Sequence, residues 1–199
     1  VPFRYRQSQY VHGLQWAIGL ELFLLIQDAS RVFLTTDHPN GAPFTSYPHL
    51  IHLLMSYDYR MSIFDHLHPD VKATSQLPSL KREYTLTEIA AMTRSGPASA
   101  LGLSKVGNLQ PGSIADIVIY NRDSQVESMF ATPRQVLRNG QTVLNDGRIL
   151  RDCSKRSYAL ALQPEASMNR MIEKVWSQFA CYSPRVSRVE EEEGVVPLC

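Results

Sequence analysis

The chain has 199 residues, of which 44% are hydrophobic and 20% charged, and its formal net charge is +1. This composition is typical of an ordinary globular protein with a real core, and it provides no electrostatic basis for binding nucleic acid or an acidic membrane surface. The three cysteines, Cys153, Cys181 and Cys199, form no Cys-x-x-Cys pair. Their spacing excludes a disulfide framework and favours a reducing, cytoplasmic compartment.

The amino-terminal stretch begins Val1-Pro2-Phe3-Arg4 and soon becomes strongly apolar. We therefore expect the chain to be a piece from within a longer polypeptide. Residues 14–26 predict a helix whose apolar side chains cover most of its circumference, so it should be sandwiched between other elements. This window is too short for a membrane span and contains Gln15 and Glu21, so no membrane insertion is expected.

Residues 32–36 are rich in β-branched and aromatic side chains and predict a short buried strand that stops at Asp37. The turn-forming residues Pro39, Asn40 and Gly41 follow directly. A buried strand that ends in a carboxylate where a loop begins is how α/β enzymes present acids to a ligand. Asp37 is therefore a candidate for catalysis. The alternative from the local pattern is that it only makes an Asx turn or caps the loop.

Four histidines occur in residues 47–69 at spacings that metal sites can use. His49 and His52 are three apart in a predicted helix over residues 47–55, but no carboxylate lies at a matching spacing, which favours ordinary, partly buried histidines. His66 and His68 form a His-x-His pair between a helical segment and a loop. Because they do not lie on a strand, where alternate residues share a face, the pair does not favour zinc binding.

The second half of the chain changes from helical to β patterning. Residues 72–82 predict a surface connection, and Thr85-x-x-Glu88 is a capping box that opens a helix over residues 86–93. This helix should break at Gly96-Pro97, where a second short helix begins and then ends near Gly102. Residues 115–150 predict a meander of strands with turns at Asn139-Gly140 and Asp146-Gly147, and Asp116 should cap a turn. Residues 164–179 predict a helix, and the acidic run 190–193 belongs to a solvated tail.

Taken together, these motifs resemble those of a known enzyme family. A strand ending in Asp, a helix ending Gly-Pro-Ala-Ser-Ala-Leu-Gly-Leu, the run Gly-x-Leu-x-Pro-Gly-x-x-Ala-Asp-Ile-Val-Ile and an Asn-Gly hairpin resemble the carboxyl-terminal part of amidohydrolase-superfamily enzymes. The segments 15–21 and 34–41 are similar to the family formed by the A subunits of formylmethanofuran dehydrogenases and of the bacterial formyltransferase/hydrolase complexes. The resemblance covers roughly residues 1–150. One departure is Gly96-Pro97-Ala98, where family proteins commonly carry Asn-Pro-Ala.

The resemblance implies an α/β fold, namely the carboxyl-terminal portion of a (β/α)8 barrel together with strands of a composite β-sandwich. Residues 1–110 would form the last barrel strand and the following helices, 111–152 the sandwich strands, and 153–199 a terminal helix and tail. The family binds a binuclear zinc centre, and of its ligand positions only Asp37 has a counterpart in this chain. Asp37 would thus be both a metal ligand and the catalytic acid–base group. His38, Asn40 and Thr45 lie beside it and would orient substrate or fix the loop.

The implied reaction is hydrolysis of formylmethanofuran to formate and methanofuran, or its reverse, within a hetero-oligomeric complex of one-carbon metabolism. Methanofuran is then the substrate carrier, and the partners are the other subunits. Two alternatives remain open: a non-catalytic scaffold subunit of the same complex, and an amidohydrolase that acts on cyclic amides. Under each of these interpretations the 199-residue piece alone should be inactive, because its barrel strand would lack its neighbours.

Overall fold

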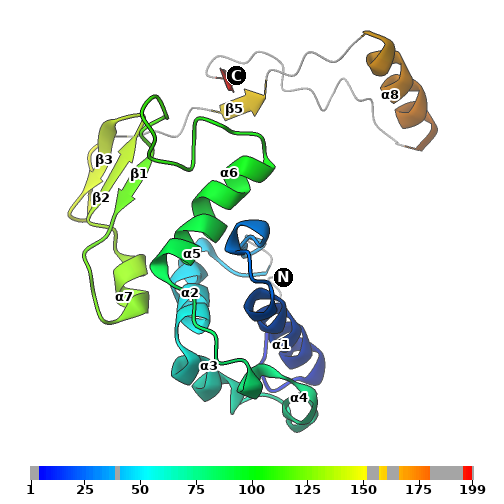
Figure 1. The fold of residues 1–199 in the computed structure, drawn as a ribbon, viewed down its shortest axis with the longest axis vertical. Coiled ribbons are helices and arrows are strands. Elements are labelled where there is room, and N and C mark those ends of the chain that lie inside the picture. The colour runs from blue at the N-terminus through cyan, green and yellow to red at the C-terminus, as the bar shows by residue number, and fades with distance from the viewer. Residues whose placement is uncertain (1–4, 39–40, 152–156, 161–165, 180–194, 199) are drawn as a thin grey trace.

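The computed structural model describes residues 5–38, 41–151, 157–160, 166–179 and 195–198. In Figure 1 the helices of the first half form one body, a small sheet lies to one side of it, and the last helix is set apart. The longer helices are α1 (Tyr10–Leu25), α2 (Tyr47–Met55), α3 (Tyr57–Phe64), α4 (Pro69–Thr74), α5 (Leu86–Ala90), α6 (Gly96–Ala100), α7 (Val126–Ala131) and α8 (Ala166–Phe179). Short turns of helix are η1 (Ala29–Arg31), η2 (Phe44–Ser46), η3 (Leu77–Ser79) and the π-turn η4 (Ala91–Ser95).

The apolar helix predicted for residues 14–26 is confirmed as α1. One side of α1 is buried, with Ala17, Leu20 and Leu24 at the three- and four-residue spacing of a helical face. On other sides Ile18 and Leu22 are 46% and 55% exposed. The described part of the chain therefore covers only some of the apolar circumference of α1.

The connection between α4 and α5 forms hydrogen bonds with the carboxyl ends of α1 and α2. The Arg82 guanidinium donates to the carbonyl oxygens of Leu24, Ile26 and Gln27 at the carboxyl end of α1, and to Glu88 at 2.6 Å. Tyr84 reaches both helices, because its hydroxyl donates to the Phe23 carbonyl and its N–H to the Leu54 carbonyl. These donors satisfy carbonyls that a helix end leaves without an intrahelical partner. Arg82, at the end of the stretch predicted as a plain surface connection (residues 72–82), thus makes partly buried hydrogen bonds to the helical core.

Arg60 of α3 is fully buried and stabilises the same region. Its guanidinium donates to the carbonyl of Leu53 at 2.7 Å, and to those of Leu80 and Arg82 at 3.0 Å each. Burial lowers the Arg60 pKa, with Glu83 acting in the opposite direction. A buried cation with three backbone acceptors fixes the geometry between α2, α3 and residues 80–82.

The capping box at Thr85 and Glu88 is confirmed, but the predicted break at Gly96-Pro97 is wrong. The chain remains helical from α5 through η4 into α6, and the Gly96 N–H bonds the Ala91 carbonyl in a π-type turn. A π-turn offsets the register of the helix locally, so Pro97, which has no N–H, is accommodated without a break. Gly96 packs tightly here, since a Cβ at this position would lie 2.7 Å from the Ser30 carbonyl oxygen.

The predicted meander is confirmed as an antiparallel sheet in the order β1-β2-β3-β4, comprising β1 (Ile117–Ile119), β2 (Gln135–Arg138), β3 (Gln141–Asn145) and β4 (Arg148–Ile149). Asn139-Gly140 and Asp146-Gly147 take positive φ at both positions, as two-residue hairpin turns require. The Asp116 carboxylate accepts the Asn139 N–H at 2.7 Å. The structural role predicted for Asp116 is therefore confirmed.

The carboxyl-terminal part holds α8, as predicted, and a parallel pair of strands that was not predicted, β5 (Ser157–Leu160) and β6 (Val195–Leu198). The acidic run 190–193 lies outside the described residues. Among the helices that the structure describes, none has the length and apolar character needed to cross a membrane.

Candidate active site

The segment that leads to Asp37 is extended but is not a strand, so the strand predicted for residues 32–36 is not observed. Val32 has β-region angles (φ −123°, ψ 138°), yet no other described segment pairs with residues 32–37 in a sheet. A strand needs a neighbour for its ladder of hydrogen bonds. Without one, residues 32–36 do not form a strand.

Side-chain burial nevertheless alternates along this segment as in a strand. Leu34 packs against the helical core and Thr36 is buried, whereas Thr35 and Asp37 are exposed. Period-two alternation means that successive side chains point to opposite faces of the segment. Thr35 and Asp37 are thus the exposed side chains at the end of this segment, and both line the cavity described below.

The turn after Asp37 folds back tightly on the end of the segment. Asp37 itself has φ +50°, and its carbonyl oxygen accepts the Gly41 N–H at 2.9 Å. The Thr36 carbonyl oxygen accepts the Ala42 N–H at 2.8 Å. A Cβ on residue 41 would lie 2.8 Å from the Thr36 carbonyl oxygen and 3.2 Å from the Asp37 Cβ, so this turn requires glycine. Backbone bonds thus hold Asp37, and among the described residues its carboxylate accepts no hydrogen bond.

Of the other predicted site residues, His38 and Thr45 are described and exposed, and Asn40 lies outside the described residues. The His38 ring stacks on Phe44 with centroids 4.1 Å apart and an interplanar angle of 17°. Phe44 in turn lies nearly parallel to Tyr47, whose hydroxyl donates to the Leu34 carbonyl. Sequence reasoning missed Phe44, although an aromatic residue in a loop beside a candidate acid was a usable signal.

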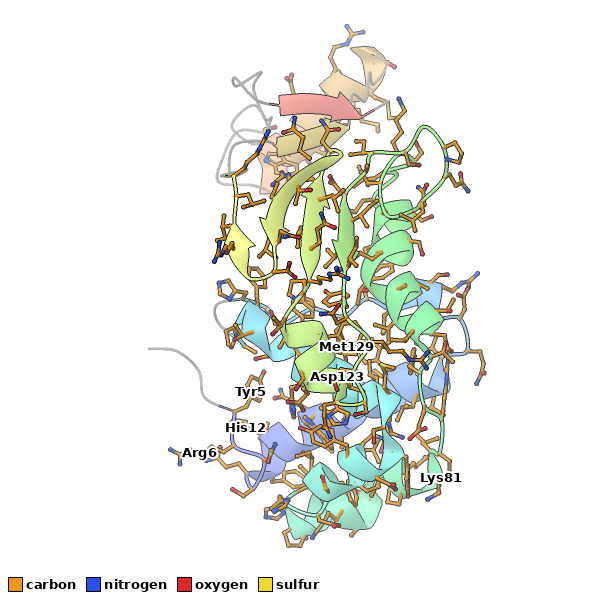
Figure 2. All side chains as sticks on the ribbon, turned by 90° about the vertical axis from the view of Figure 1, so that its left-hand side faces the viewer. Tyr5, Arg6, His12, Lys81, Asp123 and Met129 are labelled. Carbon is orange, nitrogen blue, oxygen red and sulfur yellow. The ribbon has the colours of Figure 1, made fainter. Side chains whose placement is uncertain are left out.

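A cavity of about 1140 Å³ opens between α1, α2 and residues 34–37. Much of its wall is apolar and comes from the helices, including Trp16, Leu20 and Leu50. Tyr5, Arg6 and His12 line it near the start of α1, where Figure 2 labels them. Asp37 and Thr36 both belong to its lining, and the buried Thr36 Oγ1 has no hydrogen-bond partner among the described residues. A buried hydroxyl without a partner marks a place where a polar ligand atom would be stabilised.

A group of four titratable side chains lies next to this cavity, where α7 packs against α2. Figure 2 shows α7, which carries the labelled Met129, set against the helical body. His49 Nδ1 lies 2.8 Å from the Tyr59 hydroxyl and 3.5 Å from Glu127 Oε1, and His52 Nδ1 lies 3.1 Å from the same carboxylate oxygen. The His52 ring also stacks on Tyr59 with centroids 3.7 Å apart.

Electrostatics within this group favour an ionised Glu127 and a neutral Tyr59. The hydrogen bond from Tyr59 lowers the pKa of Glu127, and burial opposes this while His52 and His49 add to it. Burial, followed by the hydrogen bond to Glu127, raises the pKa of Tyr59 to about 12. The interpretation of His49 and His52 as partly buried histidines thus agrees with the structure, which adds a carboxylate from a distant part of the chain.

The remaining histidines also have local partners. His66 Nδ1 lies 2.8 Å from the Ser62 carbonyl, and His68 Nδ1 accepts the Asp70 N–H at the start of α4. Within the ranges that the structure describes, no three His, Cys, Asp or Glu side chains are arranged to hold a metal ion. The Asp37 carboxylate lines the cavity, is exposed and accepts no hydrogen bond from the described residues. A free carboxylate oxygen is a suitable zinc ligand, so Asp37 fits the role of one ligand among several.

A family model described as "Amidohydrolase family" matches residues 2–144, and the chain therefore belongs to this family. Its mixed helix and strand structure is consistent with a piece of an amidohydrolase-type fold.

The chain is similar to two curated proteins. It is 44% identical over 173 residues to the A subunit of the Fhc formyltransferase/hydrolase complex of Methylorubrum extorquens, covering 87% of this chain and 32% of the relative. It is 38% identical over 191 residues to "Protein FwdA" of Methanocaldococcus jannaschii, covering 92% of this chain and 34% of the relative. This chain therefore spans about a third of the length of these relatives.

A solved structure matches as well. The crystal structure of the formyltransferase/hydrolase complex FhcABCD from Methylorubrum extorquens, in complex with methylofuran, contains a chain that is 39% identical in sequence. The match has a TM-score of 0.81 and covers 99% of this chain and 37% of that chain. The resemblance to the A subunits of these complexes is thus confirmed over most of the chain.

Proposed function

We propose that this chain is part of the catalytic subunit of a metal-dependent N-formyl amide hydrolase. The reaction is the conversion of formylmethanofuran and water to formate and methanofuran, in either direction. The observation that carries this proposal is the exposed Asp37 carboxylate, which lines the cavity between α1, α2 and residues 34–37 and accepts no hydrogen bond from the described residues. In this proposal residues 32–36 become the last strand of a barrel when neighbouring strands pair with them. Residues 111–152 belong to a composite β-sandwich, and 153–199 form the terminal helix and tail.

The chemistry assigned to Asp37 follows from what amide hydrolysis needs. An amine is a poor leaving group until it is protonated, so one carboxylate that first takes a proton from the attacking water and then passes it to nitrogen serves both half-steps. When bound, a binuclear zinc centre would supply activated water and polarise the formamide carbonyl, with Asp37 as one of its ligands. The tight turn through Gly41 limits the movement of Asp37 and so keeps its carboxylate in a reactive position.

The flat rings beside Asp37 suit the rest of the substrate. The solved relative is described as bound to methylofuran, whose name denotes a furan ring. His38 and Phe44 form an exposed stacked pair next to the acid, and an aromatic ring of the substrate could extend this stack. Partner subunits of a hetero-oligomeric complex and a cytoplasmic location belong to the same proposal.

The test is Asp37→Asn in the full-length subunit within its complex. The amide keeps the shape of the side chain but cannot act as a base, so formate release should fall by at least about a thousandfold while the complex still assembles. Turnover that stays near the wild-type value would refute the assignment of Asp37. Metal analysis of the same complex tests the scaffold alternative, because a scaffold that has lost its centre would contain no stoichiometric zinc.

A further inference from the structure

His49 belongs to two features at once. It lines the cavity that Asp37 also lines, and it is one of the four hydrogen-bonded side chains His49, His52, Tyr59 and Glu127. The wall continues along the chain from Asp37 through Gly41, Ala42 and Ser46 to His49, all of which line the cavity. The His49 side chain is 36% exposed, whereas that of His52 is 19% exposed and His52 does not line the cavity. His49 thus belongs both to this hydrogen-bonded group and to the lining of the cavity.

The hydrogen bonds of this group determine which nitrogen of His49 carries the proton. The Glu127 carboxylate can only accept hydrogen bonds, and its Oε1 lies 3.5 Å from His49 Nδ1 and 3.1 Å from His52 Nδ1. A lone pair on His49 Nδ1 would face this carboxylate, so Nδ1 carries the proton, and the Tyr59 oxygen, 2.8 Å away, accepts from it. A neutral His49 therefore carries its proton on Nδ1, and Nε2 is left as an acceptor. Nε2 has no hydrogen-bond partner among the described residues.

We propose that His49 is a substrate-contacting residue, whose Nε2 accepts a hydrogen bond from the amide N–H of the formamide substrate. This proposal rests on the proposed function, because it assigns His49 to the same cavity as Asp37. A neutral acceptor on the N–H orients the amide plane and leaves the nitrogen free to receive the proton from Asp37. Tyr59 and Glu127 are positioning residues in this scheme, because they fix the proton on Nδ1 and do not touch the substrate.

Two substitutions at His49 distinguish the role of Nδ1 from that of Nε2. His49→Asn keeps a donor near the Nδ1 position, which can still reach Tyr59, but has no atom in the place of Nε2. His49→Gln keeps an acceptor near the Nε2 position and loses the donor at Nδ1. In the full-length subunit within its complex, we expect H49N to raise KM for the formyl amide by about tenfold with a smaller change in kcat. H49Q should stay within about threefold of the wild-type KM.

His66→Asn is the matched control, since His66 also lines the cavity but has Nδ1 against the carbonyl of Ser62 in the preceding helix α3. Its KM should change by less than about twofold. A wild-type KM in H49N, with D37N inactive, would overturn the role of His49 and leave the proposed function intact. Activity in D37N would overturn the proposed function itself. Should H49N fail to assemble, H49Q is compared with His49→Ala: equal KM values in these two would overturn the proposal, and a lower KM in H49Q supports it.

Discussion

The Gly41 N–H donates to the carbonyl oxygen of Asp37 at 2.9 Å, and the Cβ of any other residue at position 41 would lie 2.8 Å from the carbonyl oxygen of Thr36. Real Cβ atoms do not approach backbone oxygen this closely, so Gly41→Ala must shift the turn and Asp37 with it. We expect kcat/KM for the formyl amide to fall by about a hundredfold, because small misplacements of catalytic groups are costly. Steady-state kinetics of the assembled complex measure this loss.

Gly19→Ala is the control for this substitution, because a Cβ at position 19 would meet nothing within 4 Å. Alanine favours a helix over glycine by about 1 kcal/mol, so G19A should keep its activity and unfold at an unchanged or slightly higher temperature. Equal activities for G41A and G19A would contradict the requirement for glycine in the turn.

Arg82→Lys should destabilise the carboxyl end of α1. A lysine has a single ammonium group and cannot reach the carbonyls of Leu24 and Gln27 and the Glu88 carboxylate in the planar geometry of the guanidinium. We expect a local loss of about 2 kcal/mol, visible as faster amide exchange in peptides that cover the end of α1, measured by hydrogen–deuterium exchange mass spectrometry.

The control is Arg31→Lys, because Arg31 forms an exposed pair with Asp28 at 3.3 Å and its side chain is 81% exposed. Exposed pairs contribute less than about 1 kcal/mol, so exchange in α1 should not change in this variant. Unchanged exchange in R82K as well would show that the carbonyls of α1 do not depend on Arg82.

Gly96→Asn places a side chain where the helix packs closely against η1. In this chain a Cβ at position 96 would lie 2.7 Å from the Ser30 carbonyl oxygen and 3.2 Å from the Phe33 ring. Overpacking of this kind typically costs about 1–3 kcal/mol, so the variant should unfold several degrees below the wild type in differential scanning calorimetry. Ser99→Asn, on an exposed position of the same helix, should change the unfolding temperature little. Equal unfolding temperatures for the two variants would mean that η1 can move away from α6.

Local sequence signals predicted the elements whose stability is local. The apolar helix α1, the capping box at Thr85 and the turn at Asn139-Gly140 all follow from neighbouring residues, and all three are confirmed. The break predicted at Gly96 failed for a physical reason. The rule that proline and glycine end a helix does not take the π-turn into account. The changed hydrogen-bond register of this turn accommodates Pro97, which has no N–H to donate.

Contacts between distant residues could not be predicted in this way. Glu127 lies 75 positions from His52, so the sequence indicated two histidines without a carboxylate, and the packing of α7 on α2 provides one. The extended segment before Asp37 illustrates the same limit, because a strand depends on a neighbour that local residues do not specify. The candidate acid was found because its signal, a carboxylate after a β-rich run, is local.

Glu127→Gln should change how the stability of the protein depends on pH. The pKa of Glu127 in the folded protein is below its ordinary value of 4.5, first because Tyr59 donates a hydrogen bond to it. A carboxylate whose pKa is lowered on folding stabilises the protein above its ordinary pKa, and this contribution is lost as the pH falls through the folded-state value. Since the Glu127 side chain is 43% exposed, we expect E127Q to be less stable by only about 0.5–1 kcal/mol at pH 7. The difference should shrink as the pH falls below 4.5. Thermal unfolding of the wild type and of E127Q across an acid pH series measures this difference in stability.

The control is Asp70→Asn, which removes the carboxylate of an exposed pair in which His68 and Asp70 are 3.7 Å apart. This variant should show a small difference in stability at every pH. If the E127Q difference were also the same at every pH, Glu127 would not be the ionised acceptor on which the protonation of His49 depends.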